Sequence, residues 1–324
     1  MAGPPLPLYI LHCILCGTSV ICNLLLMTLI FIHTPPSNRS YSVLIISLSL
    51  LELITALTSF ALFQRLIPCG SSLFMVSSGP AIYFDSRRLC FVLYAIMMHG
   101  HAHYICMMAL LFCFRYYVLI KPTPRSRSVA LVCIVYYVPT ALIFGVLSGS
   151  DIAPENEIIE KVNVTIGYDL RGSMITGYSS VFEPRLTLAI FWVCGPSGTF
   201  AWLIIFLGSR IHQKLKSRTH SMSETTRLMH RELMLALTVQ ASLTVIFAFS
   251  VFTYVLMQFN LVHGAVIEYS THMLGEICLG SSPIVTMYYV RSYRRAVISC
   301  NICRKRVTAA PQYRFDSEMP SFQP

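Results

Sequence analysis

The sequence predicts an all-α membrane protein, a bundle of seven transmembrane helices with an extracellular N-terminus and a cytoplasmic C-terminus. Hydrophobic residues make up 55% of the 324-residue chain and charged residues only 12%, whereas soluble domains carry about 25% charged residues. The hydrophobic residues form seven long runs, and the basic residues are concentrated on alternate sides of them. A soluble core, with its short repeating pattern, does not produce such runs.

Each predicted span is long enough for a helix that crosses a bilayer, which needs about 20 apolar residues. The third run exceeds the bilayer thickness, so we expect it to tilt and to extend into the cytoplasm. The first run is longer than that of a signal peptide and has no basic segment before it, which favours a retained helix. The spans are Leu8–Ile32, Tyr41–Phe63, Leu89–Ile120, Val129–Ser148, Leu186–Gly208, Leu233–Met257 and Tyr269–Val290.

The connecting segments set the orientation through the positive-inside rule. Of the 24 Lys and Arg residues, 18 lie in segments 33–40, 121–128, 209–232 and 291–324 or at the inner end of the third span. These segments are therefore cytoplasmic, and residues 291–324 form a cytoplasmic tail after a bundle in residues 1–290. The net charge is +10, and the basic residues that produce it lie between apolar runs. This pattern indicates membrane topology and not nucleic-acid binding.

Arg115 and Tyr116 lie at the inner end of the third span, beside a basic loop. An arginine at that depth is either a topology anchor or a switch residue, and both interpretations remain open. Pro283 removes a backbone hydrogen bond in the seventh span and permits a kink. Tyr288 lies at the inner end of the same span. It either anchors the helix at the membrane interface or belongs to a helix that moves.

His99 and His103 share one face of the third span because they are four residues apart. Two histidines at this spacing can ligate a metal, but a site needs further ligands that the sequence does not identify. We therefore expect no bound metal and no cofactor, and favour burial in the bundle, which is compatible with contact with a ligand. Glu276 in the seventh span is an intramembrane acid that either serves a function or fixes helix packing.

Several short motifs lie between the end of the second span and the tail. They are Leu66–Gly70, Gly79-Pro80 with Tyr83-Phe84, Cys90–Tyr94 with His99 and His103, Arg115–Leu119, and Pro283–Arg295. In this order and spacing they resemble the nematode chemosensory receptors with seven helices, and most of all the serpentine receptor class delta. Two positions depart from the pattern, since Phe114 replaces an acidic residue common in related receptors and Ala81 replaces an expected cysteine.

The resemblance implies a G-protein-coupled receptor that detects an environmental chemical, as in olfaction, in the plasma membrane of sensory neuron cilia. Its implied partners are a small-molecule ligand, a heterotrimeric G protein and membrane lipids, with no nucleic acid. Arg115 resembles the arginine that ends the third helix across the wider superfamily, and Pro283 resembles the proline of the seventh. We expect the ligand to bind among the third, fifth, sixth and seventh spans. Glu224 and Glu232 are the expected acidic partners of Arg115, and we expect an Arg115–Glu232 ion pair to hold the resting state.

Three modifications are predicted near the loops. Cys69 and Cys90 are the only cysteines near the outer loops, where disulfides persist, so we predict a bond between them. Asn163 lies in a sequon of the acidic outer loop and is predicted to be glycosylated. Cys300 and Cys303 follow the seventh span among basic residues and are predicted to be palmitoylated.

Other classes of membrane protein fit parts of the sequence. Ser197 in the fifth span resembles the nucleophile of rhomboid proteases, and His272 would serve as its base in an intramembrane serine protease. A Gly-Pro kink explains the same stretch, so we expect no enzyme. A ligand-gated channel is the other alternative, but insect odorant receptors of that kind have a cytoplasmic N-terminus. A retinal-binding protein is disfavoured because no lysine lies within a predicted span.

Overall fold

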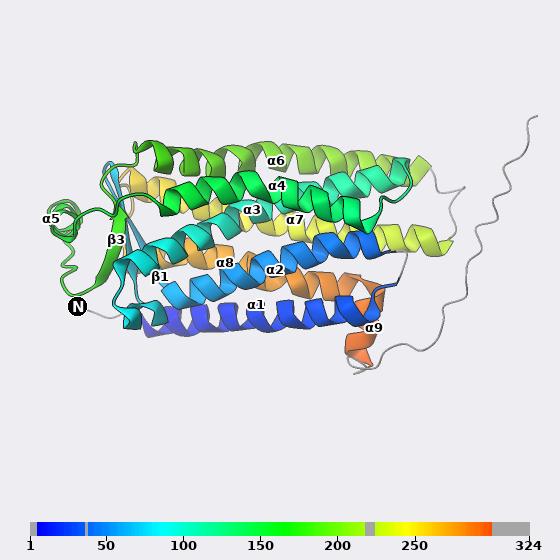
Figure 1. Ribbon diagram of the computed structural model, residues 1–324, viewed down its shortest axis with the longest axis horizontal. Helices are drawn as coiled ribbons and strands as arrows, with labels where there is room; N and C mark the ends of the chain where they lie inside the picture. Colours follow the sequence, from blue (N-terminus) through cyan, green and yellow to red (C-terminus); the bar gives the residue numbers. More distant parts are fainter. Residues whose placement is uncertain (1–4, 36–37, 218–223, 300–324) are drawn as a thin grey trace, which may run out of the picture.

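The computed structural model describes residues 5–35, 38–217 and 224–299, without the side chains of residues 196–198, 201 and 215–231. Long helices run side by side along the molecule (Figure 1). Each predicted span lies within one of them to within one residue, so the prediction of these helices is confirmed. They are α1 (Leu6–His33), α2 (Arg39–Leu62), α3 (Arg87–Ile120), α4 (Ser126–Ser148), α6 (Pro184–Ser217), α7 (Glu224–Gln258) and α8 (Ala265–Tyr289).

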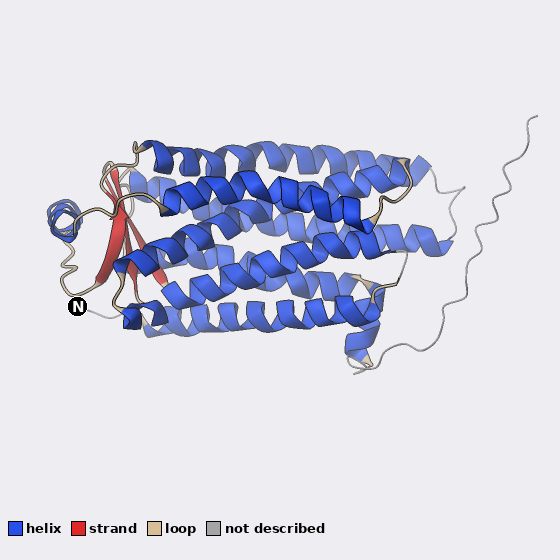
Figure 2. Ribbon diagram, viewed as in Figure 1, coloured by secondary structure: helices blue, strands red, loops and turns tan. Residues whose placement is uncertain are grey.

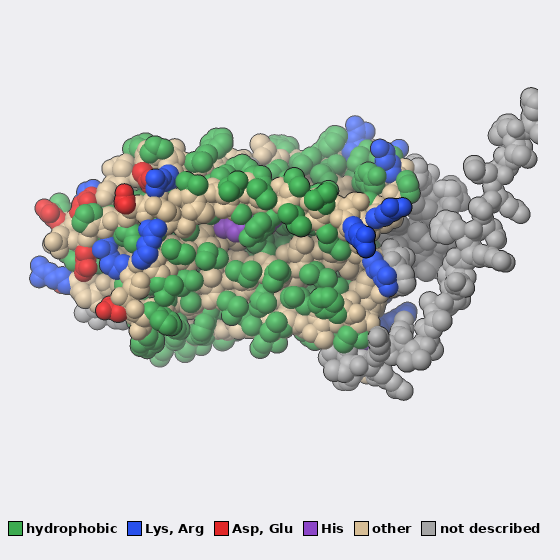
Figure 3. All heavy atoms as spheres, viewed as in Figure 1, with side chains coloured by type: hydrophobic (Ala, Val, Ile, Leu, Met, Phe, Trp, Pro, Cys, Tyr) green, Lys and Arg blue, Asp and Glu red, His purple; other side chains and the backbone are tan. Residues whose placement is uncertain are grey.

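Five of these helices are long and apolar enough to cross a membrane, namely α1 to α4 and the Glu232–Gln258 part of α7. Within the described side chains, α6 contributes a shorter apolar segment, Pro184–Gly195. Helix α8 carries Glu268, His272 and Glu276, polar residues that the bundle buries. Figure 3 shows the resulting surface on the face in view, where hydrophobic side chains cover the middle and charged side chains gather at the two ends.

A three-stranded antiparallel sheet, which was not predicted, covers one end of the bundle (Figure 2). Its strands β1 (Gln64–Cys69), β2 (Ser72–Ser77) and β3 (Met174–Tyr178) lie in the order β1-β2-β3. Gly70 begins the two-residue turn between β1 and β2 with φ +56°, a conformation that glycine adopts without strain. This end is termed the sheet end, and the opposite end is termed the α9 end after the short helix α9 (Arg291–Ile298).

The sheet is buried on both faces. Successive strand residues point to opposite sides, so Leu66 and Leu73 join the main core of the helices, whereas Ile67 and Phe74 face the other way. On that outer side they pack against the amphipathic helix α5 (Glu155–Ile166). The sheet is therefore a lid, held between the bundle and α5.

This alternation corrects the predicted Cys69–Cys90 disulfide. Cys69 lies with Ile67 on the α5 side of the sheet, where its Sγ contacts the carbonyl oxygen of Lys161 at 3.6 Å. Cys90, near the start of α3, belongs to the main core of the bundle. The two thiols thus lie in the cores on opposite faces of the sheet, and both are free. The predicted disulfide is wrong for this structure.

The Gly79-Pro80 motif has a structural explanation. It starts the short 3-10 helix η2 (Pro80–Phe84), which connects the sheet to α3. Gly79 lies so close to the end of α2 that a Cβ atom on it would come within 2.6 Å of the carbonyl oxygen of Ala61. Since backbone atoms cannot move aside as a side chain can, this close approach requires glycine.

Candidate functional site

A pocket lies between the helices directly below the lid. The space between its walls, including the part open to solvent, is about 720 Å³, and the walls come from α3, α4, α6, α7 and α8. Leu66 of β1 and Leu73 of β2 also line it. Most of the lining is apolar, as is usual for small-molecule sites. The pocket therefore lies among the helices where the sequence led us to expect a ligand, with α4 as an additional wall.

Two histidines of the pocket have unused hydrogen-bonding atoms. His101 of α3 is 4% exposed and His272 of α8 is 8% exposed. Among the described residues, the Nε2 atoms of both lack a hydrogen-bond partner. A buried polar atom without a partner costs free energy, which a ligand with a suitable polar group can recover. In contrast, the hydroxyl of Ser250 in the same wall already donates to the carbonyl oxygen of Thr271 at 2.5 Å.

Neighbouring residues fix both imidazole rings. A Cβ atom on Gly275 would come within 2.6 Å of Cε1 of His101, so the glycine allows the ring to lie against α8. Phe247 stacks on His101 with 5.9 Å between ring centroids and an interplanar angle of 26°. Tyr94 meets the ring of His272 edge-on at 5.9 Å. The pocket thus holds its two histidines in place without a ligand, which reduces the cost of binding one.

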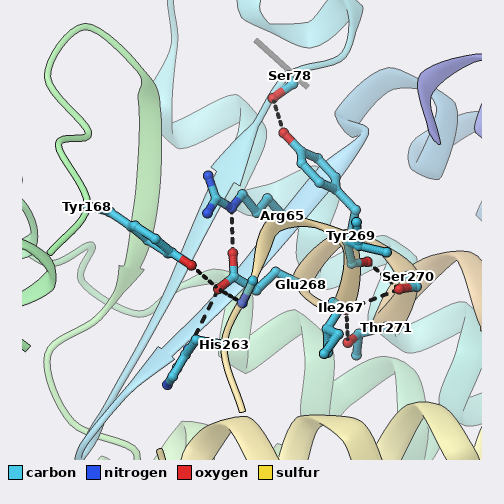
Figure 4. A network of polar contacts seen from close by, with 11 residues as sticks. Arg65, Ser78, Tyr168, His263, Ile267, Glu268, Tyr269, Ser270 and Thr271 are labelled. Carbon is cyan, nitrogen blue, oxygen red and sulfur yellow. Dashed lines mark hydrogen bonds and ion pairs between the residues drawn. The ribbon is translucent and has the colours of Figure 1, made fainter. Parts of the chain in front are cut away.

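Glu268 connects the lid to the first turn of α8 (Figure 4). Its fully buried carboxylate accepts hydrogen bonds from Nε of Arg65 at 2.6 Å and from the hydroxyl of Tyr168 at 3.2 Å, and lies 3.6 Å from Nδ1 of His263. Burial and the charge of Glu268 raise the pKa of Tyr168, so its hydroxyl stays a donor. These four residues are termed the Glu268 latch.

We expect Glu268→Gln to lower the free energy of unfolding by about 3–5 kcal/mol, since it leaves the charge of Arg65 without its buried partner. The matched control is Glu157→Gln, which breaks a more exposed pair with Lys161 at 2.7 Å. Such surface pairs contribute at most about 1 kcal/mol. Unfolding of the purified variants measures the difference, and equal losses in the two variants would show that the latch does not hold the lid.

The histidines predicted to touch a ligand pack against α4 and do not line the pocket. His99 and His103 stack on each other with ring centroids 5.7 Å apart. Nδ1 of His103 lies within hydrogen-bonding distance of the hydroxyl of Thr140, at 3.0 Å, and both rings meet Tyr137 edge-on. Their contacts are those of buried packing residues. A direct contact with ligand is not supported by this arrangement.

Glu276, the third predicted ligand residue, also lies outside the pocket lining. Its carboxylate accepts a hydrogen bond from the hydroxyl of Ser59 at 2.6 Å and pairs with Nδ1 of His12 at 2.9 Å. It therefore joins α8 to α1 and α2. His12 was not singled out from the sequence, because a lone histidine in the first span gives no signal of a partner 264 positions away.

Arg115 packs against an aromatic ring and not against an acid. Its guanidinium carbon lies 3.7 Å from the ring centroid of Tyr41 in α2, and the side chain is 5% exposed. In the described part of the chain, its Nε and Nη2 atoms have no hydrogen-bond partner. The predicted Arg115–Glu232 pair is wrong, because Arg291 and Arg294 of α9 bind Glu232 at 2.6 and 3.8 Å.

The remaining predicted switch residues lie toward the α9 end. Tyr116 is half-buried and packs against the main core. Pro283 is buried inside α8 without ending the helix. Tyr288 is 59% exposed and meets the ring of Tyr289 edge-on at 5.0 Å. Their roles in signalling stay predictions.

Some predicted positions lie outside the described residues. These are Cys300 and Cys303, the predicted palmitoylation sites. They also include the side chains of Ser197, the nucleophile of the alternative protease, and of Glu224, the other acid predicted as a partner of Arg115. His272, the base of that alternative, lines the pocket. Palmitoylation therefore stays a prediction.

Long apolar helices that surround a lidded pocket define a membrane protein with a small-molecule site as the class of protein. Residues 8–299 match the family described as Serpentine type 7TM GPCR chemoreceptor Srd, and the chain belongs to this family. The resemblance seen in the motifs is thereby confirmed.

Relatives from Caenorhabditis elegans carry the same family name. The chain is 28% identical to serpentine receptor class delta-1 over 292 residues, which cover 88% of this chain and 78% of the relative. It is 28% identical to class delta-3 over 286 residues, or 86% and 83% of the two chains. It is 29% identical to class delta-18 over 280 residues, or 85% and 82%. These relatives are named as receptors and not as enzymes.

Proposed function

We propose that this chemoreceptor binds a small molecule in the pocket below the lid and activates a heterotrimeric G protein at the α9 end. The observation that carries the proposal is the pair of unpartnered Nε2 atoms of His101 and His272 in an otherwise apolar pocket. Sites for small molecules are mostly apolar with a few fixed polar groups. The ligand is therefore a mainly hydrophobic molecule with one polar group that hydrogen-bonds to these imidazoles.

The proposed orientation has the sheet end outside the cell and the α9 end in the cytoplasm, with α6 and α8 completing seven spans. The distribution of charge supports it, because the segments at the α9 end hold most of the basic residues of the sequence. The segment between α4 and β3 instead carries several acids, and on the face in Figure 3 the acidic side chains lie at the sheet end. The proposed location is the plasma membrane of sensory cilia.

Glycosylation tests this orientation. Asn163 lies on α5 above the lid and is exposed, so we expect it to carry a glycan. Asn38 lies in a second sequon, Asn38-Arg39-Ser40, between α1 and α2 at the α9 end, and should stay unmodified. Glycosidase treatment should shift the gel mobility of the wild type but not that of Asn163→Gln. A shift that persists in Asn163→Gln and vanishes in Asn38→Gln would invert the orientation.

The proposed G-protein site surrounds Arg115. Two donors of its buried guanidinium have no partner among the described residues, and release of Arg115 from Tyr41 would let them reach carbonyl or carboxylate groups of the G protein. A groove between α6 and α7, lined by Phe112, Gly208 and Thr238 among others, lies in the same half of the bundle. Helices that a groove separates can move apart with little loss of packing, and such a movement would open the α9 end to the partner.

A ligand screen in cells tests the function directly. Cells that express the receptor are exposed to aliphatic and aromatic alcohols, ketones and carboxylic acids, and a second messenger is recorded. We expect a response to compounds with one polar group on a hydrophobic body, and none in cells without the receptor. Activation only by highly polar or multiply charged compounds would contradict the proposed pocket.

A further inference from the structure

A buried cluster of metal-binding side chains joins α1 to α8 beside the pocket. His12 and Cys16 are one turn apart on α1, and Glu276 faces them from α8. Their exposed fractions are 1%, 1% and 3%. Nδ1 of His12 lies 2.9 Å from Oε1 of Glu276 and 3.8 Å from Sγ of Cys16. One ligand atom from each residue lies within 4.8 Å of the others.

Two neighbours orient this cluster from outside. Ser59 of α2 donates a hydrogen bond to Oε1 of Glu276 at 2.6 Å. The ring of Phe63 lies against the imidazole of His12 with 4.6 Å between ring centroids. Metal sites have such outer contacts, which hold the ligands in position.

We propose that His12, Cys16 and Glu276 bind one Zn²⁺ ion. Imidazole nitrogen, thiolate sulfur and carboxylate oxygen are the ligand types that zinc has in proteins. Charge also favours a divalent ion, since the thiolate and the carboxylate together carry two negative charges and the complex is then neutral inside the bundle. Cu⁺ would leave a buried negative charge, and Mg²⁺ and Ca²⁺ prefer oxygen ligands to sulfur.

Binding replaces two protons with one ion. The thiol proton of Cys16 and the proton held between His12 and Glu276 leave to water. Zinc bonds of about 2.3 Å to sulfur and 2.0–2.1 Å to nitrogen or oxygen imply ligand atoms about 3.3–3.6 Å apart in a tetrahedron. The His12–Glu276 separation of 2.9 Å then widens and the Cys16–His12 separation of 3.8 Å narrows, each by a few tenths of an ångström. The Cys16–Glu276 separation, which is within 4.8 Å, narrows by at most about 1.2 Å. A water molecule completes the coordination.

The ion would brace the wall of the pocket. Glu276 lies one helical turn from His272, which lines the pocket from the same helix. A zinc bond from α1 to this turn restricts how far α8 can move at the sheet end. The bound ion would therefore stabilise the arrangement in which His272 meets the ligand.

The experiment uses the full chain in lipid nanodiscs, first stripped of metal by a chelator and then given Zn²⁺ alone. We expect one tightly bound Zn²⁺ per chain after dialysis, a higher Tm with the ion, and an X-ray absorption signal from a sulfur neighbour at about 2.3 Å. Cys16→Ser should lose the bound ion and the rise in Tm. Cys13→Ser, which changes a partly exposed cysteine of the same helix, should keep both.

Several results would overturn the proposal: zinc retention in the wild type no greater than in Cys16→Ser, zinc bound through nitrogen and oxygen only, or equal loss in Cys13→Ser. The X-ray absorption measurement is made on the wild type, so misfolding of a variant cannot produce or hide its result. The experiment involves neither the chemical ligand nor the G protein. Its failure is therefore separate from a failure of the proposed function.

Discussion

Replacing Arg115 with alanine is expected to abolish ligand-driven signalling at an unchanged surface level, and Tyr41→Leu is expected to raise basal signalling about 5- to 30-fold. Both expectations rest on the proposed coupling to a G protein. The guanidinium lies 3.7 Å from the ring centroid of Tyr41 in a buried site. A cation–π contact of this kind contributes about 1–2 kcal/mol. Its loss releases Arg115 from α2 and shifts the receptor toward the signalling state by the corresponding factor.

The surface level of Arg115→Ala should stay normal for an electrostatic reason. Removing one member of a buried ion pair is costly because the other charge is left uncompensated. None of the ion pairs between described residues includes Arg115, and its Nε and Nη2 atoms have no partner there. Among the described residues, alanine therefore leaves no charge unpaired. The substitution removes the guanidinium donors that are proposed to bind the G protein.

Tyr41→Phe is the matched control, since it keeps the ring and should leave basal signalling unchanged. Second-messenger output and antibody labelling of intact cells are measured together for every variant, so that signalling is expressed per receptor at the surface. If Arg115→Ala signals like the wild type, Arg115 is only a topology anchor. If Tyr41→Leu has unchanged basal signalling, the contact does not restrain Arg115.

The long helices were predictable because each needs only a local run of about 20 apolar residues. The lid was not, because its strands are six residues or fewer and are buried on both faces. Such strands lack the alternating pattern that marks a half-exposed sheet. Their pairing also joins residues 72–77 to residues 174–178, a contact between distant segments that local sequence does not reveal.

The sequence did not identify His101 as a pocket residue, and the reason is geometric. Successive residues of a helix are about 100° apart, so His101 points about 200° away from His99 and about as far from His103. The spacing of the histidines showed which two share a face, but not which face meets the cavity. That depends on the positions of α7 and α8, where Phe247 and Gly275 receive the ring of His101.

The predicted Arg115–Glu232 ion pair is wrong because arginines of another helix bind Glu232 instead. The two residues have opposite charges and lie near the same end of the bundle, which made a pair plausible from the sequence. The sequence predicts a cytoplasmic tail after the seventh span, but the first turns of this segment form α9 and bring Arg291 and Arg294 to Glu232. Tyr293 anchors α9 by a hydrogen bond of 3.0 Å between its hydroxyl and that of Thr34.

His101→Leu and His272→Leu are each expected to raise the EC50 of an activating compound about tenfold, the equivalent of about 1.4 kcal/mol for a lost buried hydrogen bond. Leucine is similar in size to histidine but has no hydrogen-bonding atom. Both imidazoles are proposed to bind the same polar group of the ligand. The EC50 of the double variant should therefore rise by less than the product of the two single-variant increases. Dose–response curves in cells measure all three variants.

The matched control is His99→Leu, which changes a buried histidine of the same helix that packs against α4 outside the pocket. Gly275→Ala gives an independent test that keeps both histidines, because its Cβ would come within 2.6 Å of the His101 ring and force the ring to turn. Gly280→Ala, whose Cβ has only ordinary contacts, should respond normally. If His99→Leu weakens the response as much as His101→Leu, the loss reflects helix packing, and the ligand does not bind these two imidazoles.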